Sequence, residues 1–372
     1  MSWHVICVTV FVLAAIPTVM GLINMFLYRV PPKPSGRVAP VSVLVPARDE
    51  EQRIRPTIES VLTSQDIELE LLVADDHSTD GTATLVVEYA ARDNRVKLLH
   101  VPDLPEGWSG KMHACHFLSQ HARHEHMIFV DADVIVSVDA LCRLSLALEQ
   151  PKNAMVSGLP RQIMLSFWEK ILIPQIHVLL LGYLPFIGMR LSTWAAFGAG
   201  CGQLLGVRKS DYEECDGHEA IRHLIHDALQ LSRLFRSHGK GTDMVDLTPM
   251  AATRMYDNVA DIWAGFLKNA HEGIATPIAL PIWTLLLVGG HIAPYILLII
   301  ALLAGYPAEL PLIACMMVIA FRVFMGWKYQ IPLISALLHP LGVGVMMILQ
   351  WVALFGAARG QQINWRGRGY TP

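Results

Sequence analysis

The sequence predicts an α/β domain with a doubly wound, mostly parallel sheet, carried between N-terminal and C-terminal transmembrane helices. Short apolar runs alternate with helical patterns between residues 41 and 130, an order typical of βα units. Both ends of the chain are long apolar stretches; of the 372 residues, 53% are hydrophobic and 16% charged. Acidic residues directly follow three of the expected strands.

The N-terminal segment, residues 1–28, is expected to be a membrane anchor. Residues 5–28 carry no charged side chain, and about 20 apolar residues cross the hydrocarbon core. Arg29, Lys33 and Arg37 follow directly. Positive charge after the segment contradicts a cleaved signal peptide and places the following domain in the cytoplasm, by the preference of basic residues for that side.

Residues 276–358 contain further apolar stretches, so we expect a multi-pass protein of the cell (inner) membrane. The first, 273–308, carries no charge and contains Gly289, Gly290 and Pro294, so a broken or re-entrant segment is possible. Arg322 interrupts the second, and 329–358 is uncharged. The number of C-terminal crossings stays open. Residues 255–275 show helical apolar spacing and predict an interfacial or an ordinary surface helix; 359–372 is a basic tail.

The middle of the chain, residues 38–254, carries the βαβαβαβ pattern. Strands are expected at 41–47, 69–74, 96–101 and 127–130, and helices at 51–64, 82–92 and 111–121. The run 41–47 is continuously apolar, as in a parallel strand buried on both faces. The net charge of −3 gives no reason to expect a nucleic-acid partner. Six scattered cysteines without CxxC spacing favour neither disulfides nor a zinc site.

Carboxylates gather where the expected parallel strands end. Arg48, Asp49 and Glu50 follow the first strand, Asp75 and Asp76 the second, and Asp131 and Asp133 the fourth, and ligands bind at this edge of such sheets. Crowded carboxylates repel one another unless a cation or hydrogen-bond donors relieve them. The GxGxxG and GxxxxGK[ST] motifs are absent from these turns, which disfavours dinucleotide and P-loop sites.

Six segments together resemble family 2 glycosyltransferases with the GT-A fold, in particular the membrane-anchored branch that includes hopene-associated and chlorobactene-type glycosyltransferases. The segments, in the family's order, are VLVPARDEE, VADDHSTDGT, GWSGKMHA, FVDADV, FGAGCGQLLGVRKSDYEECDGHEAI and HDALQLSRLFRSHG. The resemblance covers about residues 38–275. It implies a nucleotide diphosphate sugar as donor, a membrane lipid as acceptor, and inversion at the sugar.

The resemblance also implies roles for single residues. Asp133 is the expected ligand of Mg²⁺ or Mn²⁺, and Asp131 a second ligand that lies nearer the ribose or sugar. Such ions prefer carboxylate oxygens and stabilise a leaving diphosphate. Lys111 opens a helix after Gly110, where a cation and free N–H groups suit a phosphate. The nucleoside is expected to contact Pro46, Ala47, Arg48, Glu50, Asp75 and Asp76.

Asp227 is the expected general base, which takes the proton of an acceptor hydroxyl. The family usually has Glu-Asp or Asp-Asp here, whereas this chain has His226-Asp227. The acceptor stays open between a terpenoid, a glycerolipid and a polyprenyl phosphate, and the last needs no base. The Gln-x-x-Arg-Trp motif of processive polysaccharide synthases is matched by Gln361-Gln362-Ile363-Asn364-Trp365, which lacks the Arg. A single transfer is therefore expected. A non-catalytic scaffold is disfavoured because Asp131, Asp133 and Asp227 are all present.

Two apolar regions near the expected site allow two interpretations each. The run 197–207 contains Gly198, Gly200, Gly202 and Gly206 in a strand-like pattern, which suits a floor for the sugar or tight packing against a neighbouring element. Residues 161–190 form an apolar loop and helix that fits either a membrane-dipping acceptor entrance or a packing helix of the domain.

Overall fold

The computed structural model describes residues 2–360, 363–365 and 368–370. The chain divides into two compact units. The sheet unit comprises Tyr28–Ile163 and Phe186–Met255, and the apolar unit comprises Met1–Leu27, Met164–Pro185 and Tyr256–Pro372. Gln361 and Gln362, part of the synthase-motif comparison, lie outside the described residues, as do 366–367 and 371–372 of the basic tail.

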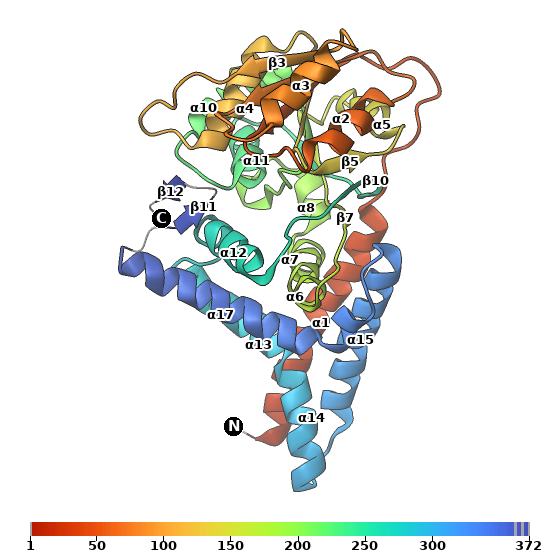
Figure 1. The fold of residues 1–372 in the computed structure, drawn as a ribbon. Helices are drawn as coiled ribbons and strands as arrows, with labels where there is room; N and C mark the ends of the chain where they lie inside the picture. Colours follow the sequence, from red (N-terminus) through yellow and green to blue (C-terminus); the bar gives the residue numbers. More distant parts are fainter. Residues whose placement is uncertain (1, 361–362, 366–367, 371–372) are drawn as a thin grey trace. The chain divides into compact units, whose positions relative to one another are not determined.

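The sheet unit contains the expected α/β sheet (Figure 1). Among the described residues the sheet has seven strands in the order β3-β2-β1-β4-β8-β6-β9. β1 (Val41–Ala47) is parallel to β2 (Leu69–Asp75) and β4 (His126–Val130), and β2 is parallel to β3 (Val96–His100). Ala47 pairs in register with Asp75. The predicted α/β sheet is confirmed, and its parallel half ends at the residues expected to bind the donor.

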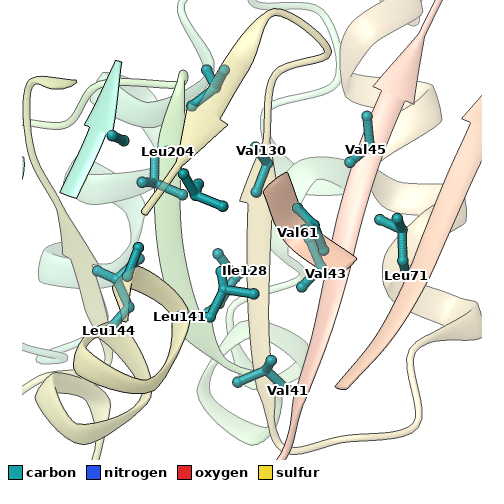
Figure 2. Packing of buried hydrophobic residues seen from close by; sticks show 14 of the residues in the cluster. Val41, Val43, Val45, Val61, Leu71, Ile128, Val130, Leu141, Leu144 and Leu204 are labelled. Atoms are coloured by element: carbon teal, nitrogen blue, oxygen red, sulfur yellow. The ribbon is translucent and has the colours of Figure 1, made fainter. Parts of the chain in front are cut away.

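Both faces of the sheet are buried, which explains the continuous apolar runs. Val43 and Val45 of β1 point into one core, which Figure 2 shows together with residues of β2, β4, β8, α2 and α5. Leu44 points into the opposite core, with residues of α4 and α11. A strand covered on both faces needs apolar side chains at consecutive positions.

The other elements of the sheet unit cover these faces and form a second, three-stranded sheet, β5-β10-β7. The helices are α2 (Ile54–Leu62), α3 (Thr82–Ala90), α4 (Gly110–His121), α5 (Ala140–Leu148), α8 (Phe186–Leu191), α9 (Lys209–Glu214), α10 (Gly217–Ala220) and α11 (Asp227–Ser237), with a 3₁₀ turn at Ala195–Phe197. The remaining strands are β5 (Val134–Val136), β6 (Met155–Ser157), β7 (Pro160–Gln162), β8 (Leu204–Arg208), β9 (Thr242–Met244) and β10 (Leu247–Thr253).

The glycine-rich run is not the single strand that its pattern indicated. β8 begins at Leu204 and runs antiparallel to both β4 and β6. Gly198, Gly200 and Gly202 precede the strand, and only Gly206 lies within it. The three earlier glycines form a connection whose backbone lies close to α11.

The apolar unit is helical. Its elements are α1 (Trp3–Leu27), α6 (Phe167–Leu172), α7 (Pro174–Tyr183), α12 (Val259–Gly273), α13 (Ala279–His291), α14 (Ala293–Ala304), α15 (Glu309–Lys328), α16 (Ile334–Leu337) and α17 (His339–Ala358), with the short strands β11 (Ile363–Trp365) and β12 (Arg368–Tyr370). Within the described residues α1, α15 and α17 are each long and apolar enough to cross a membrane, and the bent pair α13–α14 makes up to four.

Three features of this unit sharpen or correct the expectations. α13 and α14 meet at a bend of 47°, as the Gly-Gly and Pro residues indicated. Arg322 does not interrupt its apolar stretch, because α15 continues through it to Lys328 with the Arg322 side chain buried. Met164–Pro185, inside the range assigned from sequence to the catalytic domain, groups with the apolar helices, and α7 packs against α1 (Figure 1).

Candidate active site

The turns after β1 and β2 are joined into one structure. The Asp76 N–H donates to the carbonyl of Ala47 (2.9 Å), and Arg48 Nη1 donates to the carbonyl of Asp76 (3.2 Å). Glu50, which is buried, donates its N–H to Thr82 Oγ1 at 2.8 Å. The structure therefore brings Ala47, Arg48, Glu50 and Asp76 together, with Pro46 and Asp75 at the adjoining strand ends.

Asp49 fixes the shape of this pair of turns. Its backbone is left-handed, with φ of 53°, a conformation that is uncommon outside glycine. Its carboxylate accepts from the Thr79 N–H (2.7 Å) and hydroxyl (3.2 Å), and its own N–H donates to Ser78 Oγ at 3.1 Å. These bonds across the two turns hold the local strain and set the positions of the donor-site candidates.

Lys111 lies at the centre of the candidate site. α4 begins at Gly110, and the Lys111 ammonium lies 2.7 Å from Asp131 Oδ1 and 2.7 Å from Asp227 Oδ2. Its side chain is 34% exposed, whereas that of Asp227 is 10% exposed. One cation, reachable from solvent, thus joins the carboxylate after β4 to the carboxylate that opens α11.

The Asp131–Asp133 turn is held by its backbone. The Asp131 N–H donates to the carbonyl of Gln203 (3.0 Å), and Thr57 Oγ1 donates to the carbonyl of Ala132 (2.8 Å). Asp133 follows in the same turn and is half-buried. The backbone that carries both carboxylates is therefore fixed to the residue before β8 and to α2.

Asp227 is the first residue of α11, and its Oδ1 accepts from the Ala228 N–H at 2.7 Å. A Cβ added at Gly202 would lie 2.3 Å from that Oδ1, and one at Gly200 would lie 2.6 Å from the Ala228 carbonyl. The glycines therefore pack against the start of α11, which is the second of the two interpretations of this run. Their contribution to the site is to make room for the Asp227 carboxylate.

Nearby charges determine the protonation state of the Asp227 carboxylate. Burial raises the pKa of Asp227, but the Lys111 ammonium, the nearby His226 and the Ala228 N–H together lower that pKa below its usual range. Burial lowers the pKa of Lys111, and Asp131 and Asp227 raise it well above the ordinary value. The Asp227 carboxylate is therefore ionised at neutral pH and is ion-paired with the Lys111 ammonium, which also contacts Asp131.

Residues 187–194, which carry exposed apolar side chains, are hydrogen-bonded to α11, the helix that begins with Asp227. Ile187, Leu191 and Trp194 are 52%, 80% and 66% exposed. Beneath them Arg236 of α11, itself buried, donates to the carbonyls of Met189 (3.0 Å), Trp194 (2.9 Å) and Ser192 (2.5 Å). The helix that begins with Asp227 therefore also holds an outward-facing apolar surface.

Two residues that organise the site are not among those predicted from the sequence. Gln203 holds Asp131 through its carbonyl and accepts from Gln162 Nε2 at 2.8 Å through its side chain. Arg236 is the second. The available signals were the position of Gln203, a polar residue in an apolar strand-like pattern, and of Arg236 on the buried face of a helix. The partners of both residues lie far away in sequence, so local patterns do not identify them.

A metal ion is compatible with the residues present, although it needs ligands beyond the protein. No group of three or more His, Cys, Asp or Glu side chains that could hold a metal occurs among the described residues. Mg²⁺ and Mn²⁺ are commonly held by one or two carboxylates together with substrate phosphates. Asp131 and Asp133 supply such oxygens, so their chemistry fits an ion that binds together with a diphosphate.

Comparison with known proteins defines the class of this fold. The structure resembles that of PcManGT, a mannosyltransferase from Pyrobaculum calidifontis solved in complex with GDP-Man and Mn²⁺, with a TM-score of 0.52 and 20% identity over 90% of this chain and 99% of that one. This likeness shows the fold, which is GT-A. Residues 42–214 match the family model "Glycosyl transferase family 2". The chain thus carries a glycosyl transferase family 2 domain.

A curated relative is the 4,4'-diaponeurosporenoate glycosyltransferase of Staphylococcus aureus. It is 27% identical to this chain over 241 residues, which cover 63% of this chain and 61% of the relative. The match therefore spans less than two thirds of the relative's length.

Proposed function

We propose that this protein is an inverting glycosyltransferase that moves a hexose from a nucleotide diphosphate sugar to a hydroxyl of a membrane lipid, in a single transfer. The observation that carries the proposal is the Lys111 bridge. It joins Asp131, at the end of a parallel strand, to Asp227, at the start of a helix, within a glycosyl transferase family 2 domain.

The nucleoside would bind the joined turns after β1 and β2. Asp76 offers acceptors to a base edge, and Glu50 to ribose hydroxyls. Arg48, fixed by its bond to the Asp76 carbonyl, is the nearby cation. Lys111 would contact the diphosphate, since an ammonium at a helix start favours phosphate oxygens. Asp131 and Asp133 would hold Mg²⁺ or Mn²⁺, which when bound neutralises charge on the diphosphate.

Asp227 would act as the general base. The acceptor oxygen attacks the anomeric carbon, the bond from that carbon to the diphosphate breaks, and the hydroxyl proton passes to Asp227. The nucleoside diphosphate leaves with the electron pair. While Lys111 holds Asp227, that carboxylate is a weak base; diphosphate oxygens that draw Lys111 away would strengthen it at the moment when the donor is present.

The acceptor would be a lipid. The exposed side chains of Ile187, Leu191 and Trp194 suit an apolar substrate or surface, and residue 186 directly follows the Met164–Pro185 segment of the apolar unit. The relative is named a 4,4'-diaponeurosporenoate glycosyltransferase, and this name supports an apolar, lipid-like acceptor.

The experiment that tests the function uses membranes containing the full chain. They are incubated with a panel of radiolabelled nucleotide sugars, the lipids are extracted, and labelled products are identified by mass spectrometry. One labelled lipid with a single hexose is the expected result, formed far more slowly by membranes with Asp227→Asn. Label in a polymer would favour a polysaccharide synthase, and label on a polyprenyl phosphate would remove the need for a base. No labelled product with any donor contradicts the proposal.

The sheet unit would face the cytoplasm, where nucleotide sugars are made. This orientation is supported by Arg29, Lys33 and Arg37 after the first span. A cysteine at position 37 should resist an impermeant thiol reagent in intact cells and react after permeabilisation. Labelling in intact cells would reverse the orientation.

A further inference from the structure

Arg322 is a cation inside the apolar unit. It lies on α15, a candidate membrane span, and is 1% exposed. Nη1 donates to the Pro174 carbonyl (3.4 Å), and Nη2 donates to the Ser335 carbonyl (3.2 Å) and hydroxyl. Nε is buried and has no hydrogen-bond partner within the described part of the chain. All of these partners are neutral, so the charge itself is not compensated by them.

Four titratable side chains from four other helices of the apolar unit lie close enough to this guanidinium to interact with its charge. They are His177 of α7, His291 of α13, Tyr295 of α14 and His339 of α17. His291 Nδ1 lies 3.0 Å from His339 Nε2, and His291 Nε2 lies 2.9 Å from the Tyr183 hydroxyl. With Arg322, these four residues are here called the Arg322 cluster.

The cluster offers unused hydrogen-bonding capacity to a ligand. Among the residues that the structure describes, His177 Nδ1, His339 Nδ1, the Tyr295 hydroxyl and Arg322 Nε are buried and have no hydrogen-bond partner. Buried polar atoms in proteins are almost always hydrogen-bonded. In a membrane, ionisable side chains are costly, are paired, and mark sites of binding or transport.

Acidic residues of the described part of the chain do not meet this need. Among those residues no carboxylate forms an ion pair with Arg322. Glu309 lies on the same helix thirteen residues earlier, about 20 Å along its axis at 1.5 Å per residue, and is exposed. The buried Glu169 carboxylate instead caps the start of α6, where it accepts from the Leu165 and Ser166 N–H groups.

We propose that the Arg322 cluster binds the oxyanion head group, a carboxylate or a phosphate, of an amphiphile whose chain lies among the apolar helices. A guanidinium matches the two oxygens of such a group and keeps its charge in an apolar setting. Imidazole and phenol groups donate further hydrogen bonds to the same anion. The inference goes beyond the proposed function, because it concerns binding that needs no nucleotide sugar.

The test measures thermal unfolding of the full chain in a neutral detergent, without donor. Two matched pairs of probes are added: oleate with oleyl alcohol, and dioleoyl phosphatidate with dioleoylglycerol. A saturating oxyanion probe should raise Tm by about 5 °C or more above its neutral partner. Response to oleate identifies a free amphiphilic acid as the ligand source, and response to phosphatidate alone identifies a membrane phospholipid. Equal effects of charged and neutral probes overturn the proposal.

Variants locate the site. Arg322→Gln should lose the difference between charged and neutral probes. Lys170→Gln, which removes a cation from α6 of the same unit, should keep it. If Arg322→Gln retains the difference, the proposal is wrong. If that variant does not fold, a photoreactive diazirine fatty acid is used with the parent protein: cross-links to α7, α15 or α17 support the site, and cross-links confined to other segments overturn it. Neither measurement depends on glycosyl transfer.

Discussion

Lys111 of the sheet unit and Arg322 of the apolar unit are both cations held inside the protein, and their surroundings differ in charge. Lys111 contacts two carboxylates, at 2.7 Å each, and is one-third exposed. Arg322 contacts carbonyls and a hydroxyl and is buried. The charge of Lys111 is balanced by its two carboxylates, so a ligand that binds Lys111 must compete with them. The charge of Arg322 is not balanced by its neutral partners, so an anionic ligand meets no such competition.

The largest effect is expected from removing the general base, Asp227, from the ion-paired group around Lys111. Asp227→Asn keeps the shape and the bond from the Ala228 N–H but cannot take a proton. Transfer should fall by roughly 10²–10⁴-fold, the usual range for a general base, with donor affinity nearly unchanged in equilibrium dialysis. Asp133→Asn should instead weaken donor binding in the presence of Mg²⁺ or Mn²⁺, and excess EDTA should do the same to the parent. Parental transfer rates in Asp227→Asn would refute the role.

Replacing the cation itself tests whether Lys111 serves the donor. Lys111→Met leaves Asp131 and Asp227 facing each other without a counter-charge and removes a phosphate contact. Charge-assisted bonds contribute about 1.5–3 kcal/mol, so the KM for the nucleotide sugar should rise roughly 10–100-fold. The exposed Lys152→Met is the control and should leave KM unchanged. An unaltered KM in Lys111→Met would show that the ammonium is structural.

The packing around Asp227 is tested at Gly202. In Gly202→Ala the new Cβ would meet Asp227 Oδ1 at 2.3 Å, so the carboxylate or the connection before β8 must shift. Overpacking of this kind typically costs about 1–3 kcal/mol, measurable as a lower urea midpoint of the sheet unit along with reduced transfer. Gly36→Ala, where a Cβ meets nothing within 4 Å, is the matched control. Parental stability and rate in Gly202→Ala would mean that the connection is not tightly fixed.

The pH dependence of stability tests the burial of His218. Burial lowers the pKa of His218 from 6.5 to about 3. Below about pH 6.5 the unfolded chain takes up a proton that the folded state refuses, so this histidine decreases the free energy of unfolding as the pH falls towards 3, by at most about 1.4 kcal/mol per pH unit. Urea unfolding between pH 4 and 7 should show a flatter dependence in His218→Gln and no change in the exposed His238→Gln. Identical slopes would contradict the assignment.

Local pattern was enough to predict the parallel half of the sheet. The run at Val41–Ala47 is apolar at consecutive positions because both of its faces are covered, and strand ends follow from such runs. The antiparallel strand β8 was not predicted, since glycines have no side chains and so show no alternation of apolar and polar positions. The close packing of Gly202 against Asp227 was not predicted either, because it depends on a helix that is distant in sequence. Arg322 was taken as the end of an apolar stretch because its neutral partners, Pro174 and Ser335, lie far away in sequence or beyond the helix end.

The site was predicted as residue types and only partly as contacts. The motifs named Lys111, Asp131 and Asp227, but the double ion pair through Lys111 is a property of the fold. The roles of Asp131, Asp133 and Asp227 in metal binding and catalysis stay predictions for the experiments above. Gln203 and Arg236 act through backbone carbonyls, which leave no trace in side-chain patterns.

The division of the apolar unit among three chain segments has a consequence for biosynthesis. Asn24 of α1 donates to the carbonyls of Leu181 (2.7 Å) and Leu184 (2.6 Å), and 157 residues separate Asn24 from Leu181. At about 5–20 residues per second, the ribosome makes these acceptors roughly 8–30 s after Asn24. During that interval the first helix has neither α7 nor α15 to pack against. The Asn24 amide therefore cannot make these two bonds until α7 has been synthesised, and α1 can complete its native packing only after that point.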